Sequence, residues 1–144
     1  MAAIVSTIEI ARPPDEVFAY ATDPTRFAEW QADVLDVRVA DGGTRFTTTR
    51  RIGRSERTMT QEVTASDPPR HWAARGIDGP IRPDATITVE PLDGGTRSQV
   101  TFGLDFAGHG IGVPLVPLVR RMAAAQAPTS YRTLKELLEA DPSY

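Results

Sequence analysis

The segment IEIARPPDEVFAYATDPTRFAEW, residues 8–30, begins as a strand and continues as two short helices. Residues 4–10 place three isoleucines on one face by alternation, which is typical of a strand with one buried face. The prolines at 13–14 end this strand, and proline followed by two acidic residues suits the first turn of a helix. Asp23 and Pro24 repeat the signal as the N-cap and first residue of a second short helix.

Six further strands are predicted between residues 34 and 106. Apolar and polar side chains alternate through this region, and many of the polar ones are threonines, which strands favour. Glycine and proline clusters interrupt the alternation, and two of the interruptions are the same Asp-Gly-Gly turn, at 41–43 and 93–95. Strands joined by such short turns favour an antiparallel meander.

A long helix is predicted after the last strand, because apolar residues from Leu115 to Leu138 recur every three or four positions. Pro128 is expected to kink it by removing one backbone hydrogen bond. The helix must bury its apolar stripe, so we expect it to pack across the concave face of the sheet. The predicted fold class is α+β: a seven-stranded curved antiparallel sheet around a long C-terminal helix, with two short helices after the first strand.

The glycine-rich run at 108–112 follows a strand and opens a helix, as phosphate loops do. Val113 stands where a dinucleotide-binding fingerprint needs glycine, and the Gly-Lys-Ser/Thr of a Walker loop is absent. We therefore expect these glycines only to let the last strand turn into the helix. His109 beside them, and Arg120 and Arg121 in the helix, are expected to face solvent.

Composition excludes several classes of function. The 144 residues suit one domain spanning residues 1–144, and they include no cysteine and only two distant histidines. Thiolate metal centres and a cysteine nucleophile are thereby excluded, and we expect neither metal nor cofactor. The net charge of −3 disfavours nucleic acid as a partner. No apolar run has membrane-spanning length and the first residues do not resemble a signal peptide, so a cytoplasmic location is expected.

Four segments resemble the helix-grip fold of the START-like (SRPBCC) superfamily, in particular its polyketide cyclase/dehydrase-type members. They are residues 8–30, TRRIGRSERTMTQEVTASDPP at 49–69, ITVEPLDGGTRSQVTF at 87–102 and SYRTLKELLE at 130–139. The resemblance covers nearly the whole chain. It implies a deep, mostly apolar cavity between the sheet and the long helix, which takes lipids, sterols, polyketides or other aromatic compounds. The superfamily spans carriers, cyclases and stress proteins, so the resemblance implies a fold rather than one activity.

The phase of each strand sorts its side chains into an inward and an outward set. Most strand carboxylates are out of phase with their apolar neighbours, so we expect them to face solvent and to form no catalytic acid–base pair. They are Glu9, Glu62, Glu90 and Asp105. The inward set holds few polar residues, and a buried polar side chain needs a partner, which a ligand can supply. The predicted ligand-binding residues are Tyr20, Trp30, Phe46, Thr48, Arg50, Met59, Gln61, Phe102, Leu104 and Met122.

Each candidate also has a purely structural interpretation. For Arg50 and Arg57 this is the preferred one, namely a surface position near a strand end or a local salt bridge. For Gln61 the two interpretations weigh equally. Trp30 is first of all a core residue and only secondarily a lid over the cavity. Tyrosines at helical spacing usually pack their rings and keep their hydroxyls near water.

The leading hypothesis is a protein that binds a hydrophobic or aromatic small molecule, lipid- or polyketide-like, as a monomer or homodimer. The alternative is a polyketide cyclase/aromatase or dehydratase, in which the cavity folds the substrate and an arginine or tyrosine stabilises enolate charge. Its candidates are Arg50, Arg57, Tyr20 and Tyr131, of which at least two must point at one spot in the cavity. A third hypothesis is a protein-interaction module, which an exposed apolar patch or a symmetric dimer would favour.

Overall fold

The computed structural model describes residues 4–52 and 54–140. The chain begins with β1 (Ile4–Ile10), α1 (Pro14–Ala21), a 3₁₀ turn (Pro24–Arg26) and α2 (Phe27–Trp30). It continues as β2 (Val34–Ala40), β3 (Arg45–Ile52), β4 (Ser55–Asp67), β5 (His71–Asp78), β6 (Ile81–Leu92) and β7 (Arg97–Gly108). A 3₁₀ segment (Gly110–Leu115) then leads into α3 (Val116–Ala140). The predicted order of strands and helices is confirmed.

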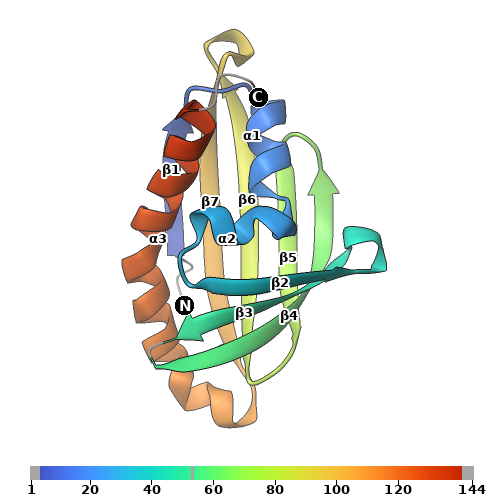
Figure 1. Ribbon diagram of the computed structural model, residues 1–144, viewed down its shortest axis with the longest axis vertical. Coiled ribbons are helices and arrows are strands. Elements are labelled where there is room, and N and C mark those ends of the chain that lie inside the picture. The colour runs from blue at the N-terminus through green and yellow to red at the C-terminus, as the bar shows by residue number, and fades with distance from the viewer. Residues whose placement is uncertain (1–3, 53, 141–144) are drawn as a thin grey trace.

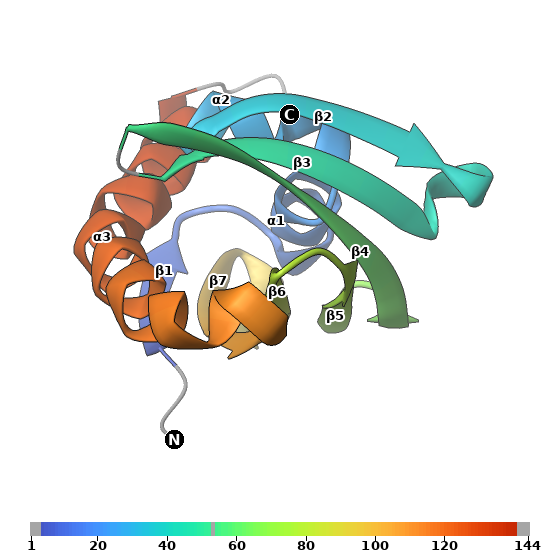
Figure 2. The ribbon, with the colours of Figure 1, turned by 90° about the horizontal axis from the view of Figure 1, so that it is seen from below.

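The seven strands form one antiparallel sheet in the order β1-β7-β6-β5-β4-β3-β2. Strands β2 to β7 form a meander, and β1 pairs with β7 at the edge of the sheet opposite β2. The sheet curls strongly, α1 lies inside the curl, and α3 runs along its open side (Figures 1 and 2). This is the helix-grip arrangement that the sequence predicts, and α3 packs against β1 and β7.

The short helices begin where their signals predict. Pro14 opens α1 with Asp15 and Glu16 in its first turn. The Asp23 carboxylate accepts a hydrogen bond from the Thr25 backbone N–H at 3.0 Å, which caps the turn before α2. After this turn α2 lies across the opening of the curled sheet, where it forms one wall of the site described below (Figure 1).

The connection from β7 to α3 needs its glycines for close packing. A Cβ atom on Gly112 would overlap the carbonyl oxygen of Pro80, a clash that no side chain tolerates. The glycine-rich run therefore has the structural role predicted for it. After this connection α3 continues to Ala140 without interruption at Pro128.

The core has two apolar clusters. The larger one is built on fully buried residues such as Ile10, Val17 and Leu134, and contains most of the aromatic side chains. The smaller one includes Met59 and Phe106 and lies under the start of α3. Side chains from both clusters line the cavity between the sheet and α3.

One outward-facing pair differs from expectation. The Asp105 carboxylate accepts a hydrogen bond from Arg120 Nε at 2.8 Å, and these side chains are only 30% and 19% exposed. Arg120 also donates to the carbonyl oxygen of Phe106 at 3.2 Å. The prediction of solvated side chains was wrong for both residues, because α3 returns beside the end of β7 and the sequence pattern of one strand cannot show this. Glu9 and Arg121 are exposed as predicted.

Candidate functional site

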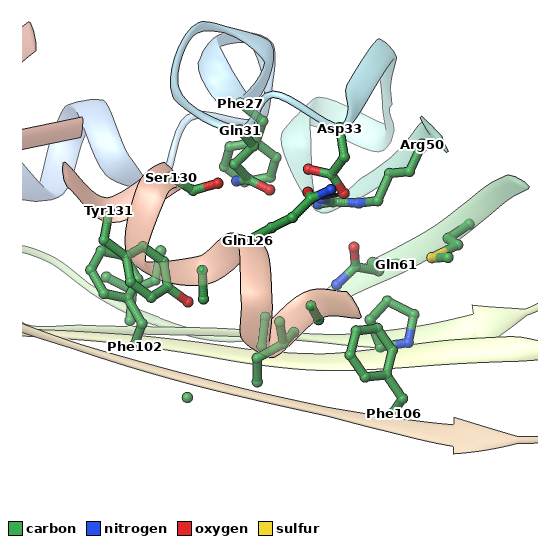
Figure 3. A pocket seen from close by; sticks show the side chains of 18 of the residues that line it. Phe27, Gln31, Asp33, Arg50, Gln61, Phe102, Phe106, Gln126, Ser130 and Tyr131 are labelled. Carbon is green, nitrogen blue, oxygen red and sulfur yellow. Dashed lines mark hydrogen bonds and ion pairs between the residues drawn. The ribbon is translucent and has the colours of Figure 1, made fainter. Parts of the chain in front are cut away.

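A cavity of about 130 Å³ lies between the concave face of the sheet, α2 and α3 (Figure 3). Most of its lining is apolar, supplied by strands β3 to β7 on one side and by the two helices on the other. Eight of the ten predicted ligand-binding residues line it: Trp30, Phe46, Arg50, Met59, Gln61, Phe102, Leu104 and Met122. The alternation of the strands and the stripe of α3 therefore bring these residues to one place, as the sequence predicts.

Aromatic rings form one wall of the cavity. The rings of Phe102 and Tyr131 stack with centroids 3.8 Å apart and an interplanar angle of 7°. Trp30 lies 5.9 Å from Phe102 and 6.3 Å from Tyr131 between ring centroids. Flat apolar surfaces of this kind suit an aromatic ring or another flat apolar group.

Buried lining residues carry polar groups without a hydrogen-bond partner among the described residues. Gln61 is 3% exposed, and its amide bonds to no other described side chain or backbone group. The Tyr131 hydroxyl is also without a partner in the described chain and lies on the cavity side of its ring (Figure 3). Burial raises the pKa of Tyr131 to about 12, although the positive charge of Arg50 acts in the opposite direction. At neutral pH this phenol is protonated and is a hydrogen-bond donor.

The polar side of the cavity is opposite its apolar floor (Figure 3). Arg50 and Asp33 form an ion pair there at 3.1 Å, and each side chain is 20% exposed. Gln31 and Gln126 lie beside this pair and also line the cavity. Arg50 therefore forms the local salt bridge that its structural interpretation predicts, and it also lines the cavity.

The sequence matches the family described as polyketide cyclase/dehydrase and lipid transport over residues 1–139. The chain belongs to this family. No curated protein matches the sequence significantly.

Solved structures support the family's fold in this chain. A START superfamily protein from Mycobacterium smegmatis superposes with a TM-score of 0.78 at 14% identity, covering 97% of this chain and 99% of its own. A protein from Thermus thermophilus gives 0.78 at 18% identity, covering 96% and 97%. The Zhui aromatase/cyclase from a Streptomyces species gives 0.72 at 16% identity, covering 94% of each chain.

Two of the ten predicted residues do not line the cavity of this polyketide cyclase/dehydrase family member. The Tyr20 hydroxyl donates to Glu29, and the Arg26 guanidinium lies 4.9 Å from the centre of the Tyr20 ring. Thr48 is completely buried, so it does not reach the lining. Helical spacing alone could not show that Tyr20 points at α2 rather than at the cavity.

Several lining residues escaped the sequence analysis. Asp33 lies in the short connection between α2 and β2, where no periodicity assigns a direction to its side chain. Gln126 and Ser130 lie on α3 outside its predicted apolar stripe. Arg57, which the sequence pairs with Arg50 as a candidate, does not line the cavity.

The described residues contain no group of three or more histidine, cysteine or carboxylate side chains placed to hold a metal ion. His71 Nδ1 lies 3.1 Å from the hydroxyl of Thr88, and His109 is exposed. Over the same residues, no helix combines the length and apolarity that membrane crossing requires. The apolar side chains of Ile111 and Val113, near the start of α3, are more than half exposed.

Proposed function

We propose that the protein binds a hydrophobic or aromatic small molecule, lipid- or polyketide-like, in the cavity between the sheet and α3. The observation that carries this proposal is the pair of unpartnered polar groups, the Gln61 amide and the Tyr131 hydroxyl, on a mostly apolar lining. A polar side chain that faces a mostly apolar cavity without a partner loses hydrogen bonding, at a cost of up to about 1–3 kcal/mol. A ligand that carries oxygen functions on an apolar body would supply partners for these groups while its body packs against Phe102 and Trp30.

The size of the cavity limits the ligand that enters without rearrangement. An apolar protein cavity of roughly 150 Å³ accepts benzene. The cavity here, at about 130 Å³, therefore suits one aromatic ring or a short apolar chain before any rearrangement of the protein. A larger polyketide would require α3 or the β3–β4 hairpin to move outward, which a ligand drives when it binds the open form better.

A direct binding titration tests this function. 2-Naphthol, a compact aromatic alcohol, is titrated against the protein and its binding is followed by fluorescence and calorimetry. Tyr131→Phe and Gln61→Leu each remove one group that the ligand would pair with, so each lowers affinity about fivefold, the equivalent of about 1 kcal/mol. Tyr20→Phe is the matched control, because Tyr20 lies off the cavity, and it leaves affinity unchanged.

Two results of the titration would overturn the proposed function. The first is the absence of saturable binding by a folded protein. The second is an equal effect of Tyr131→Phe and Tyr20→Phe, which would place the bound molecule outside the cavity.

The second candidate function is a polyketide cyclase/aromatase or dehydratase activity in the same cavity. One observation favours it: Arg50 and Tyr131, two of the four groups predicted for such chemistry, line the same cavity. An arginine and a protonated phenol can both stabilise negative charge on an enolate oxygen. Incubation with a linear poly-β-carbonyl thioester would yield an aromatic product, and Arg50→Gln would slow its formation. Saturable binding of the thioester without an aromatic product would rule out the enzymatic candidate and leave ligand binding as the proposed function.

The proposal includes a cytoplasmic location and a monomer or homodimer that needs no nucleic acid. Size-exclusion chromatography with light scattering, run with and without 2-naphthol, measures the oligomeric state. An assembly larger than a dimer, with or without 2-naphthol, would contradict this part of the proposal.

A further inference from the structure

An ion pair interrupts the mostly apolar lining of the cavity. Arg50 Nη1 donates a hydrogen bond to Asp33 Oδ2 at 3.1 Å, and the side chains of both residues are only 20% exposed. Asp33 is the one carboxylate among the described residues that line the cavity. Its oxygens lie next to the Arg50 guanidinium group in Figure 3. The positive charge on this side of the cavity is therefore already paired within the chain.

Arg50 is the cation whose charge acts most directly in the cavity. Burial raises the pKa of Tyr131 and the positive charge of Arg50 lowers it, so this charge is felt across the cavity. Arg51 also lines the cavity, but it follows the outer face of the sheet, opposite Glu56, and is exposed to water, which weakens its charge interactions. Arg57 lies opposite Arg50 on the inner face and is not part of the lining.

The backbone holds Asp33 beside Arg50. The Arg51 N–H donates to the Asp33 carbonyl oxygen at 2.8 Å, and Val34, the next residue, pairs in register with Arg50. The Val34 N–H in turn donates to the Gln31 carbonyl oxygen at 3.1 Å. These bonds tie the connection between α2 and β2 to β3, so the Asp33 carboxylate is in place before a ligand enters.

We infer that Asp33 determines which charge the ligand may carry: by pairing with Arg50, it makes the cavity select uncharged molecules with a carbonyl, amide or hydroxyl group. This inference rests on the proposed binding function and names the class of its ligand. An anionic ligand would lose its water on an apolar lining and lie beside the Asp33 carboxylate, and both effects oppose binding. The ion pair engages Arg50 Nη1 alone among the described residues, so an uncharged oxygen can accept from the other N–H groups of this guanidinium.

The test compares 2-naphthoate with 2-naphthamide, its uncharged counterpart of nearly the same shape, and uses 2-naphthol as the reference for the binding function. All three are titrated at neutral pH, where a carboxylic acid is ionised and a phenol is not. We expect wild type to bind 2-naphthamide about tenfold more tightly than 2-naphthoate, because only the anion is repelled by Asp33. This comparison uses the unaltered protein, so it does not depend on the folding of a variant.

Asp33→Asn is expected to raise the affinity for 2-naphthoate about tenfold and to keep that for 2-naphthol within about twofold, because Arg50 then pairs with the ligand carboxylate. The gain should disappear in Asp33→Asn/Arg50→Gln, which removes the whole ion pair. Asp36→Asn is the matched control. It removes a carboxylate from the exposed ion pair with Arg38, off the cavity lining, and leaves all three affinities unchanged.

Four results overturn the inference, and saturable binding of 2-naphthol then leaves the proposed function standing. Wild type may bind 2-naphthoate as tightly as 2-naphthamide, or Asp33→Asn may bring no gain for 2-naphthoate. An equal gain in Asp36→Asn would show that net charge alone explains the effect, and a gain that persists without Arg50 would show that another cation binds the anion. Failure of all three probes to bind folded wild type overturns the proposed function together with the inference.

Discussion

The proton of Tyr131 decides how its hydroxyl takes part in any chemistry of the cavity. Burial raises the pKa of this phenol to about 12 in the folded protein. The pKa of an unfolded tyrosine is about 10. Tyr131→Phe removes the hydroxyl and keeps the ring that stacks on Phe102. Because the hydroxyl has no partner among the described residues, the variant should fold normally at neutral pH.

The two pKa values fix both the sign and the size of the effect on stability. Below about pH 10 the phenol is protonated in both states and contributes no pH dependence. Between about pH 10 and pH 12 the unfolded chain releases the proton while the folded protein keeps it, so the stability of the wild type falls as pH rises. Each unit of pKa difference is worth about 1.4 kcal/mol, so this residue contributes a loss of about 2–3 kcal/mol over that range.

Urea denaturation of wild type and Tyr131→Phe at a series of pH values measures the effect. The free energies of unfolding should stay parallel up to about pH 10 and then separate, with the wild type losing more. If the two proteins lose stability in parallel through the alkaline range, Tyr131 ionises as readily in the folded state as in the unfolded one. The phenol would then be open to water, and its role as a buried hydrogen-bond donor would be refuted.

Three further changes test the packing that supports the cavity. Thr48→Val should stabilise the protein by about 1 kcal/mol, a rise of about 3 °C in Tm, because the buried Thr48 hydroxyl has no partner among the described residues. The control Thr49→Val, on the outer face, should change the Tm little. A lower Tm for Thr48→Val would contradict the expected stabilisation. Gly112→Ala should cost about 3 kcal/mol or more in urea denaturation, since its Cβ would meet a carbonyl oxygen of the β5–β6 turn; unchanged stability would show that this close approach is absent. Asp105→Asn should cost about 1–2 kcal/mol by removing the carboxylate that holds Arg120, and an equally stable variant would show that the ion pair contributes nothing.

The fold was predictable because local signals along the chain agree with one another. The Asp-Gly-Gly turns adopt the positive φ angles that such turns require, with φ of 53° at Asp41 and 51° at Asp93. The strands that follow these turns alternate apolar and polar side chains, so the inward positions of Phe46, Gln61 and Phe102 follow from phase alone. Those positions include most of the residues that line the cavity.

Residues in short helices and connections were harder to assign. Tyr20 shares the helical spacing of buried residues, but its hydroxyl reaches Glu29 on the next short helix instead of the cavity. Asp33 lies in a connection where no periodicity predicts the direction of its side chain, and its role depends on the ion pair with Arg50 of β3. In both cases the direction of a side chain depends on the angle between two elements, which is set by packing and not by local sequence.

The sequence by itself determined the order of elements, the inward face of each strand, the family, and the exclusion of cysteine chemistry. These follow from chain periodicity, turn chemistry and composition, which are local properties. Only the tertiary structure decided which polar groups lack partners. Arg50 is neutralised by Asp33, whereas Arg57, at the opposite position, has no counter-charge among the described residues. The Gln61 and Tyr131 side chains line one cavity without bonding to the described chain. Whether a buried polar group is satisfied depends on atoms from elements far apart in the sequence, so it is a property of the folded molecule alone.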